Sequence, residues 1–305
     1  MEKIRITEVQ DTNFGRCMKM ENGVAELMVT LDFGPRIIHY ALVGHENIMY
    51  QDLTHRPIGE AFPVFGGDVL RLYGGHRLWI SPEILPRCYH PDNQPVECIE
   101  IPGGMEFIAP VEEVSLVQKS IAVVMGENSG DVEIMHKITN HGQWEIEIAP
   151  WAITQLAPGG VAVIPIAGPK TGVLPNRVLA LWDYTNTNDE RLTLGRDYAI
   201  IRQSQEVQEA FKIGLYNHLG FGAYFNRGQA FFKHFDVTEG EFPDFGCNFE
   251  TYTNNNFLEN ETLGCLETIG HGESVLHKEI WKIFPEETIP QTEVDAAKII
   301  GKLLG

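Results

Sequence analysis

Long apolar runs and a cysteine framework are both missing from this sequence of 305 residues. No stretch approaches the about 18 consecutive apolar residues of a membrane-spanning helix. The first ten residues, MEKIRITEVQ, lack the apolar core of a signal peptide. The five cysteines are widely spaced and form no CxxC pair, which indicates neither a zinc knuckle nor a disulfide framework. We therefore expect a cytoplasmic protein with reduced thiols.

Positive charge is scarce as well. Lys and Arg number 23 against 42 Asp and Glu, which gives a formal net charge of −19. Such an excess of negative charge repels phosphate backbones and anionic lipid surfaces. We therefore expect neither nucleic acid nor a membrane surface as a partner, and a neutral or cationic small molecule is the easier ligand.

Several catalytic signatures are absent too. The chain contains no GxSxG, no P-loop, no GxGxxG that opens a helix and no HExxH. Nucleophile-elbow hydrolases, nucleotide enzymes and zincins are thereby disfavoured. The sequence predicts neither a metal nor a cofactor.

What the sequence does contain is apolar alternation with a period of two residues. It is found at residues 24–31, 120–125, 132–138, 145–148, 161–166 and 275–284. Turns rich in Gly, Pro and Asn separate these segments, and no linker, charge block or internal repeat divides the chain. The pattern predicts one all-β domain over residues 1–305, built as a large sandwich or barrel.

A helical pattern is confined to residues 292–304. Thr292 can cap the first turn, and Asp295 favours the positive end of the helix dipole. Apolar residues then recur at helical spacing at Val294, Ala297, Ile300, Leu303 and Leu304. We expect a short C-terminal helix packed on the β-domain.

The densest group of potential binding residues lies between residues 74 and 93. It interleaves aromatic, basic and acidic side chains: His76, Arg77, Trp79, Glu83, Arg87 and Tyr89. Arginine supplies a fork of donors to vicinal hydroxyls or carboxylates, and tryptophan offers a flat apolar face to sugar C–H groups. Interleaving on loops favours a binding site. The alternative is that Arg77 pairs with Glu83 while Trp79 fills the core.

Two further candidates lie in apolar surroundings. Trp151 follows a predicted strand, and it either lines a cleft or plugs the sandwich. Lys212 lies inside an apolar run and needs a partner or a ligand if it is buried. Asp189 and Arg191, by contrast, favour a structural ion pair.

Two glutamates share one predicted strand. Glu259 and Glu261 are two residues apart, so both side chains point to the same face. Neighbouring carboxylates repel, which raises one pKa and makes a general base usable near neutral pH. The alternative is a solvated acidic face.

Several short motifs follow one another along the chain in a recognisable order. Asn22-Gly23 precedes an alternating strand, and Phe33-Gly34-Pro35-Arg36-Ile37 follows it. The turn Gly74-Gly75-His76 comes next, and LETIGHGESV at 266–275 precedes Trp281-Lys282-Ile283-Phe284. In this order they resemble the galactose mutarotase-like superfamily, which includes the aldose 1-epimerases. The resemblance spans residues 20–285 and implies a large antiparallel β-supersandwich with a sugar site on a concave face.

The resemblance also implies a catalytic base. Aldose 1-epimerases use a glutamate as base on the anomeric hydroxyl and a histidine as acid on the ring oxygen. Glu261-Thr262 and Glu267-Thr268 both fit the motif of the base. Glu267 lies only five residues before Gly272, which leaves little room for a strand end and a turn. The base is therefore placed at Glu261, with Glu267 as the second choice.

The acid departs from the family pattern. By spacing, Trp151 occupies the position of the acid, and tryptophan cannot transfer a proton at neutral pH. His141 fits a turn instead. The proton is then expected from His76, which titrates in a useful range, or from Lys212.

Two functions follow from these residues. The first is a mutarotase-type isomerase, with Glu261 as base and His76 as acid. Its substrate-holding residues are Arg77, Trp79, Glu83, Arg87, Tyr89, Trp151, Lys212 and Glu259. The second is a non-catalytic carbohydrate-binding module on the same fold. In both, a neutral or acidic sugar stacks on Trp79 or Trp151 and accepts forked bonds from Arg77 and Arg87.

Overall fold

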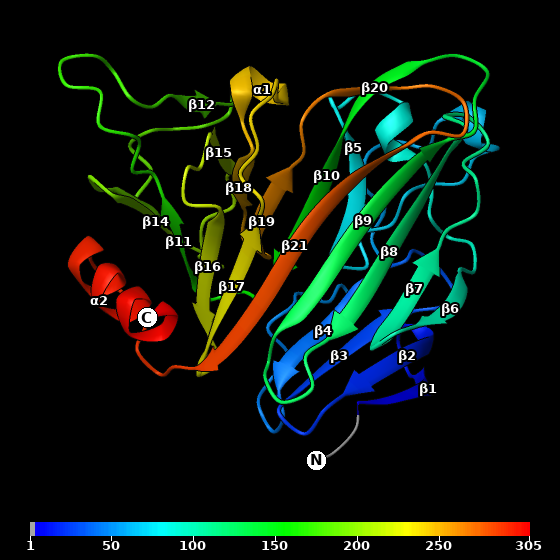
Figure 1. Cartoon of the computed structure of the whole chain (residues 1–305), viewed down its shortest axis with the longest axis horizontal. Coiled ribbons are helices and arrows are strands. Elements are labelled where there is room, and N and C mark those ends of the chain that lie inside the picture. The colour runs from blue at the N-terminus through cyan, green and yellow to red at the C-terminus, as the bar shows by residue number, and fades with distance from the viewer. Residues whose placement is uncertain (1–3) are drawn as a thin grey trace.

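Two large antiparallel sheets make up most of the computed structural model, which describes residues 4–305 (Figure 1). The first sheet has 11 strands and the second has 10. Helical structure is limited to two 3₁₀ turns, the single turn α1 (Pro243–Gly246) and the C-terminal helix α2 (Glu293–Leu304) in the described part of the chain. This architecture confirms the prediction of a large antiparallel β-sandwich with a short C-terminal helix.

The order of strands in each sheet is as follows. The first sheet runs β1 (Arg5–Asp11), β2 (Gly15–Glu21), β3 (Ala25–Thr30), β4 (Ile37–Leu42), β5 (His76–Ser81), β10 (Ile146–Leu156), β19 (Leu258–Leu263), β18 (Phe249–Thr253), β15 (Phe211–Leu215) and β12 (Leu179–Leu181), and β20 (Glu267–Ile269) also pairs with β10. The second runs β13 (Leu192–Leu194), β14 (Tyr198–Arg202), β11 (Val161–Pro165), β16 (Phe221–Asn226), β17 (Gln229–Phe235), β21 (Ser274–Pro285), β9 (Val132–Asn140), β8 (Val117–Met125), β7 (Gly104–Ile108) and β6 (Glu97–Ile101).

Alternation along the strands builds the core between the sheets. In β21, Val275, His277, Glu279 and Trp281 are all buried, while the residues between them are more exposed. The main apolar cluster takes members from both sheets, such as Ile80 of β5 and Trp281 of β21. The face of each strand that points toward the other sheet is thus fixed by its alternation.

Helix α2 covers the outer face of the second sheet. Thr292 forms a capping box with Asp295, as the sequence predicted. The buried face is Ala296, Ile299 and Ile300, which pack in one cluster with residues of β11, β14, β16 and β17. The predicted apolar face was partly wrong, because Val294 and Ala297 point to solvent. Neither α2 nor any other helix within residues 4–305 has the length and apolarity to cross a membrane.

A pair of glycines sets the start of β5. Gly74 and Gly75 both have positive φ, at 94° and 70°. A Cβ atom on Gly75 would lie 2.2 Å from the carbonyl oxygen of Ile37. Only glycine allows the chain to turn this close to β4 and then enter the sheet between β4 and β10.

Candidate functional site

The predicted site residues converge on one face of three neighbouring strands. Ile153 of β10 pairs with Arg77 of β5 on one side and with Glu261 of β19 on the other. Two residues earlier on β10, Trp151 pairs with Trp79 of β5 and with Leu263 of β19. Because alternate residues share a face, these side chains all point away from the second sheet.

This face forms the floor of a cleft of about 600 Å³. The walls are loops, which contribute Pro57, Tyr89, Trp182, Tyr184 and Phe257. The predicted site residues that line the cleft are Arg77, Trp79, Glu83, Tyr89, Trp151, Lys212 and Glu259. Such a concave pocket, lined by both aromatic and polar side chains, is typical of a small-molecule site.

Glu261 shares this face of the sheet but does not line the cleft, and it is completely buried. Its Oε2 accepts hydrogen bonds from Trp151 Nε1 at 2.7 Å and from Lys212 Nζ at 2.9 Å. The Lys212 ammonium also lies 2.6 Å from Glu250 Oε2. Burial opposes the charge of Lys212, but Glu261 and Glu250 outweigh it and raise the lysine pKa above its ordinary value.

Lys212 therefore has the carboxylate partners that its apolar surroundings required. Its Nζ also lies 4.8 Å from the ring centre of Trp151 and 4.6 Å from that of Trp182. Both distances are within the range of cation–π attraction. The ammonium group is fixed by two carboxylates and two indole rings.

Glu259, two residues before Glu261, lines the cleft itself. Its Oε1 accepts a hydrogen bond from Gln155 Nε2 at 2.8 Å. Burial raises the pKa of Glu259 to about 7, and the neighbouring charge of Glu261 adds to the effect. Opposing contributions come from Arg77 and Lys212. A carboxyl group with this pKa exchanges protons readily at neutral pH.

Arg77 has buried hydrogen-bond donors that contact no acceptor within residues 4–305. Its guanidinium lies 4.0 Å from the ring centre of Trp79 and is almost completely buried. Burial, with the charge of Arg36, lowers its pKa to about 10. Neither Nε nor Nη1 has a hydrogen-bond partner within residues 4–305. Glu83 accepts from the Tyr89 hydroxyl instead, so the alternative Arg77–Glu83 pair is not formed.

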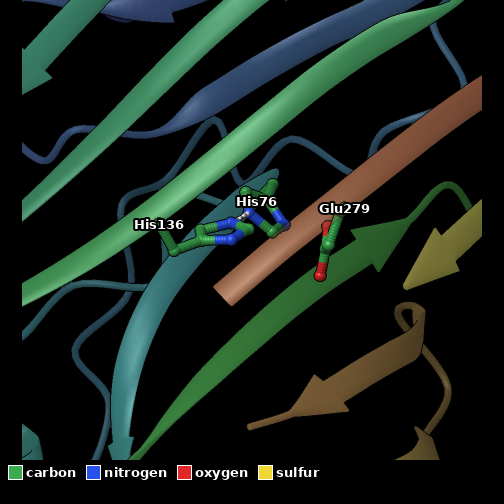
Figure 2. Close-up of side chains that lie close together, drawn as sticks. All are labelled: His76, His136 and Glu279. Carbon is green, nitrogen blue, oxygen red and sulfur yellow. Dashed lines mark hydrogen bonds between the residues drawn. The ribbon is translucent and has the colours of Figure 1, made fainter. Parts of the chain in front are cut away.

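His76 is not brought to the cleft. It is the first residue of β5, and its ring points to the second sheet, where Nε2 lies 2.7 Å from Nε2 of His136 (Figure 2). The sheet separates His76 from Glu261, because neighbouring residues of a strand face opposite sides. His76 and Glu261 therefore cannot act as acid and base on the same sugar, which corrects the prediction of this pair.

Three other residues also lie outside the cleft lining. Arg87 donates from Nη2 to the Pro82 carbonyl at 2.8 Å. Glu267, the second choice for the base, is exposed on β20. His141 lies in an exposed turn, as its sequence position predicted. Asp189 and Arg191 form the expected bidentate ion pair.

The inner face of the same strands holds a second polar cluster. Lys233 Nζ donates to Thr154 Oγ1 at 2.9 Å, so the Thr154 hydroxyl can donate to His76 Nδ1 at 2.8 Å. His76 Nε2 then donates to His136 Nε2, and His136 Nδ1 donates to the His277 carbonyl at 2.9 Å. Each ring nitrogen of these two histidines has one partner.

Glu279 completes the inner cluster. It lies 3.0 Å from Lys233 Nζ and accepts from Thr262 and, at 2.7 Å, from Trp281 Nε1. His76, His136 and Glu279 offer three ligand atoms within 4.8 Å of one another, which is close enough for a metal ion. Lys233, however, already neutralises Glu279, and a dication would add uncompensated charge to the core. We interpret the inner cluster as a hydrogen-bonded structural network.

Several residues of the cleft, and one beneath it, were missed from the sequence alone. Trp182, Tyr184, Gln155 and Tyr252 line the cleft but were not assigned to the site. The buried Glu250 was not assigned either. The strand register carries the missing information, because Glu259 pairs with both Gln155 and Tyr252, and Glu261 pairs with Glu250.

Comparison with known proteins shows a likeness in fold. No protein-family model matches the chain, and no curated protein matches it either. A galactose mutarotase-like protein from Clostridium acetobutylicum has a TM-score of 0.58 and 8% identity, over 93% of this chain and 100% of that one. A putative aldose 1-epimerase from Klebsiella pneumoniae has a TM-score of 0.56 and 10% identity, over 99% and 86%.

A larger protein contains the same fold. A TPR-domain containing protein from Parabacteroides distasonis has a TM-score of 0.60 and 11% identity, over 91% of this chain. The chain spans about half of that protein, since the match covers 49% of it. The predicted resemblance to galactose mutarotase-like proteins is confirmed for the fold, and identities this low extend to nothing finer.

Proposed function

We propose that the protein binds a sugar in the cleft and interconverts its anomers by acid–base chemistry, with Glu259 as the proton-exchanging group. The observation that carries this proposal is that a guanidinium with two unpaired nitrogens and a nearly buried carboxyl group line the same cleft. Arg77 supplies the donors and Glu259 the carboxyl group. Buried groups without partners in a pocket are expected to find them on a ligand.

The ligand chemistry follows from the lining. Trp79, Trp151 and Trp182 give flat apolar faces, which suit the C–H face of a sugar ring. Arg77 adds positive charge that no carboxylate pairs within residues 4–305, so hydroxyl, carboxylate or phosphate oxygens all suit the positions beside it. A neutral or acidic sugar thus fits better than a cationic ligand.

The chemical step is the opening and closing of a hemiacetal ring. Glu259 removes the proton of the anomeric hydroxyl as C1=O forms and the bond from C1 to the ring oxygen breaks. The ring oxygen needs a donor at that moment. Lys212 has three ammonium hydrogens: Glu261 accepts one, and Glu250 Oε2 lies 2.6 Å from the nitrogen. Its third hydrogen is suited to the ring oxygen.

Glu259 replaces Glu261 as the proposed base because of access. Glu261 is completely buried and is absent from the cleft lining, whereas Glu259 is part of it. A base must come within hydrogen-bond reach of the proton that it removes. In this proposal Glu261 has another role, which is to fix Lys212 and Trp151. The epimerase and mutarotase names of the fold neighbours support the reaction class only by analogy.

A binding module without turnover is the second candidate. One observation favours it: Lys212 lies within 3 Å of two buried glutamates, which raise its pKa and make its ammonium group a weak acid. Without proton donation to the ring oxygen, the cleft would hold a sugar without opening it.

A titration followed by an exchange measurement separates these candidates. Calorimetry with D-glucose, D-galactose, D-glucuronate and D-glucose 6-phosphate identifies a sugar that binds. We expect Trp182→Ala to weaken its binding by about tenfold, equivalent to about 1.4 kcal/mol. Trp144→Ala is the matched control, because that indole is 81% exposed and lies outside the cleft lining.

Anomer exchange of the bound sugar is then followed by NMR. Acceleration by the wild-type protein supports the isomerase. Binding without acceleration supports the module. Failure of every sugar in the panel to bind, or equal effects of Trp182→Ala and Trp144→Ala, contradicts both.

A further inference from the structure

Two buried carboxyl groups face each other beneath the cleft. Glu250 of β18 and Glu261 of β19 are direct partners in the strand register. Both side chains are completely buried. A single ammonium group lies between them, with Lys212 Nζ 2.6 Å from Glu250 Oε2 and 2.9 Å from Glu261 Oε2.

The charges at this position do not balance if both carboxyl groups are ionised. Two buried negative charges would face one positive charge, and uncompensated buried charge is costly. Asp244 of α1 adds a further negative influence on Glu250. Beyond the Lys212 ammonium, neither oxygen of Glu250 has a hydrogen-bond partner within residues 4–305. A proton on one carboxyl group removes the imbalance.

The hydrogen bonds distinguish the two carboxyl groups. Glu261 receives two, from Trp151 and Lys212, whereas Glu250 receives none within residues 4–305 and only contacts the ammonium group. Glu250 lies in an apolar space that Gly214 leaves open, beside the indole of Trp182. A Cβ on Gly214 would lie 3.2 Å from both Glu250 Cγ and Trp182 Cη2. Burial, together with the charge of Glu261, raises the pKa of Glu250 well above its usual range.

We propose that Glu250 is a positioning residue, held as a neutral carboxylic acid behind Lys212, which leaves Glu261 as the anionic partner of the ammonium group. Glu261 Oε2 accepts one ammonium hydrogen, and Glu250 Oε2 contacts the same nitrogen at 2.6 Å. The third hydrogen is thereby directed to the cleft, where Lys212 is part of the lining. The role in holding a sugar rests on the function proposed above, whereas the protonation of Glu250 does not.

The protonation is tested by the pH dependence of unfolding. A carboxyl group whose pKa is raised in the folded state stabilises the protein below its unfolded pKa and loses this effect as pH rises. The unfolded reference for Glu250 is 4.5. Relative to Glu250→Gln, the wild-type unfolding constant should therefore increase by about tenfold for each pH unit between pH 5 and 7.

The matched control for this measurement is Glu133→Gln. Glu133 is exposed and pairs with Lys278 at the surface. Its difference from the wild type should stay flat over the same pH range. A flat difference for Glu250→Gln as well would mean that Glu250 is ionised, which overturns the proposal.

Infrared spectroscopy gives a second readout that does not need the Glu250 variant to fold. In the Glu259→Gln variant at pH 7, the carbonyl band of a protonated carboxyl group should remain. Its absence overturns the proposal. Where Glu250→Gln does fold, the same substitution added to Glu259→Gln should remove the band, and a band that persists overturns the assignment.

The positioning role is tested with a sugar that binds the wild type. Glu250→Gln keeps a neutral group that accepts from Lys212, so affinity should stay within about threefold, whereas Glu250→Ala should weaken binding by about tenfold. Equal loss in both variants overturns the positioning role. If no sugar binds, the proposed function fails while the unfolding and infrared results still decide the state of Glu250.

Discussion

The two faces of strands β5, β10 and β19 carry charged clusters that differ in how completely they are paired. On the inner face, Lys233 and Glu279 neutralise each other, and His76 and His136 are bonded in a chain. On the cleft face, the Arg77 nitrogens Nε and Nη1 have no partner within residues 4–305. The charged and imidazole groups of the inner cluster all have partners, although the amide of Asn260 on the same face has none within residues 4–305, whereas the guanidinium on the cleft face is left unpaired.

This difference in pairing indicates which cluster stabilises the fold and which is available to a ligand. Burial costs a polar group its water, and the inner cluster recovers this cost through internal hydrogen bonds. The cleft cluster leaves Arg77 and Glu259 available at the edge of a cavity. Changes on the inner face should therefore reduce stability, and changes on the cleft face should reduce binding.

The largest expected effect is on the inner face. Lys233→Met leaves Glu279 buried without its cation and should lower the free energy of unfolding by about 3–5 kcal/mol. The measurement is chemical denaturation. Lys278→Met is the matched control, because its pair with Glu133 is exposed and should contribute about 0–1 kcal/mol. Equal effects of the two substitutions would mean that the inner cluster does not stabilise the core.

Acid should also act on the inner face. Burial lowers the pKa of His76, His136 and His277 from 6.5, and that of His277 to about 3. A lowered folded pKa stabilises the protein above the unfolded pKa and loses this effect as pH falls. His277 should therefore remove about 1.4 kcal/mol per pH unit as pH falls from about 6 toward 4, and His76 and His136 should act in the same direction.

Denaturation at several pH values measures this slope. The His277→Gln variant should lose one histidine's share of it, about 1.4 kcal/mol per pH unit. The exposed His45 serves as control, and His45→Gln should keep the wild-type slope. An unchanged slope in His277→Gln would contradict the assignment of a neutral, buried histidine.

The cleft face should respond in ligand affinity instead. For a sugar that binds the wild type, Arg77→Ala removes charged donors and should cost about 1.5–3 kcal/mol of binding, or about tenfold to a hundredfold in Kd. Arg87→Ala is the control, since Arg87 contacts the Pro82 carbonyl outside the cleft lining. Calorimetric titration distinguishes them. An equal loss of affinity in both variants would restore Arg87 to the site.

The smallest expected effect concerns Glu267. This glutamate was the second choice for the base, but it is exposed on β20 and outside the cleft lining. Glu267→Gln should leave both affinity and anomer exchange unchanged within about twofold, as for surface substitutions that remove no buried contact. A loss of exchange comparable to that of Glu259→Gln would place the base at Glu267.

Much of the fold could be predicted from the sequence because alternation is a local signal. Alternation over residues 275–284 places Val275, His277, Glu279 and Trp281 on one face, and all four are buried. The prediction of the buried face of α2 was less accurate, because contacts with the second sheet determine that Ala296 and Ile299 are buried. Helical spacing alone fits more than one apolar stripe.

The site was predictable in composition but not in orientation. Arg77, Trp79 and Glu259 do line the cleft. His76 and Arg77 are neighbours in sequence, and only the register of β5 against β10 and β4 decides which of them faces the cleft. The burial of Glu261 likewise depends on Lys212 and Trp151, which come from two other strands. Such long-range contacts leave no local trace in the sequence.

The central claim is that Glu259, rather than its buried neighbour Glu261, exchanges the proton. The direct measurement is the NMR rate of anomer exchange for a bound sugar in wild type, Glu259→Gln and Glu267→Gln. Glu259→Gln should lower the rate by about 10²–10⁴ while the sugar still binds, and Glu267→Gln should match the wild type. Exchange at the wild-type rate in Glu259→Gln would contradict the claim.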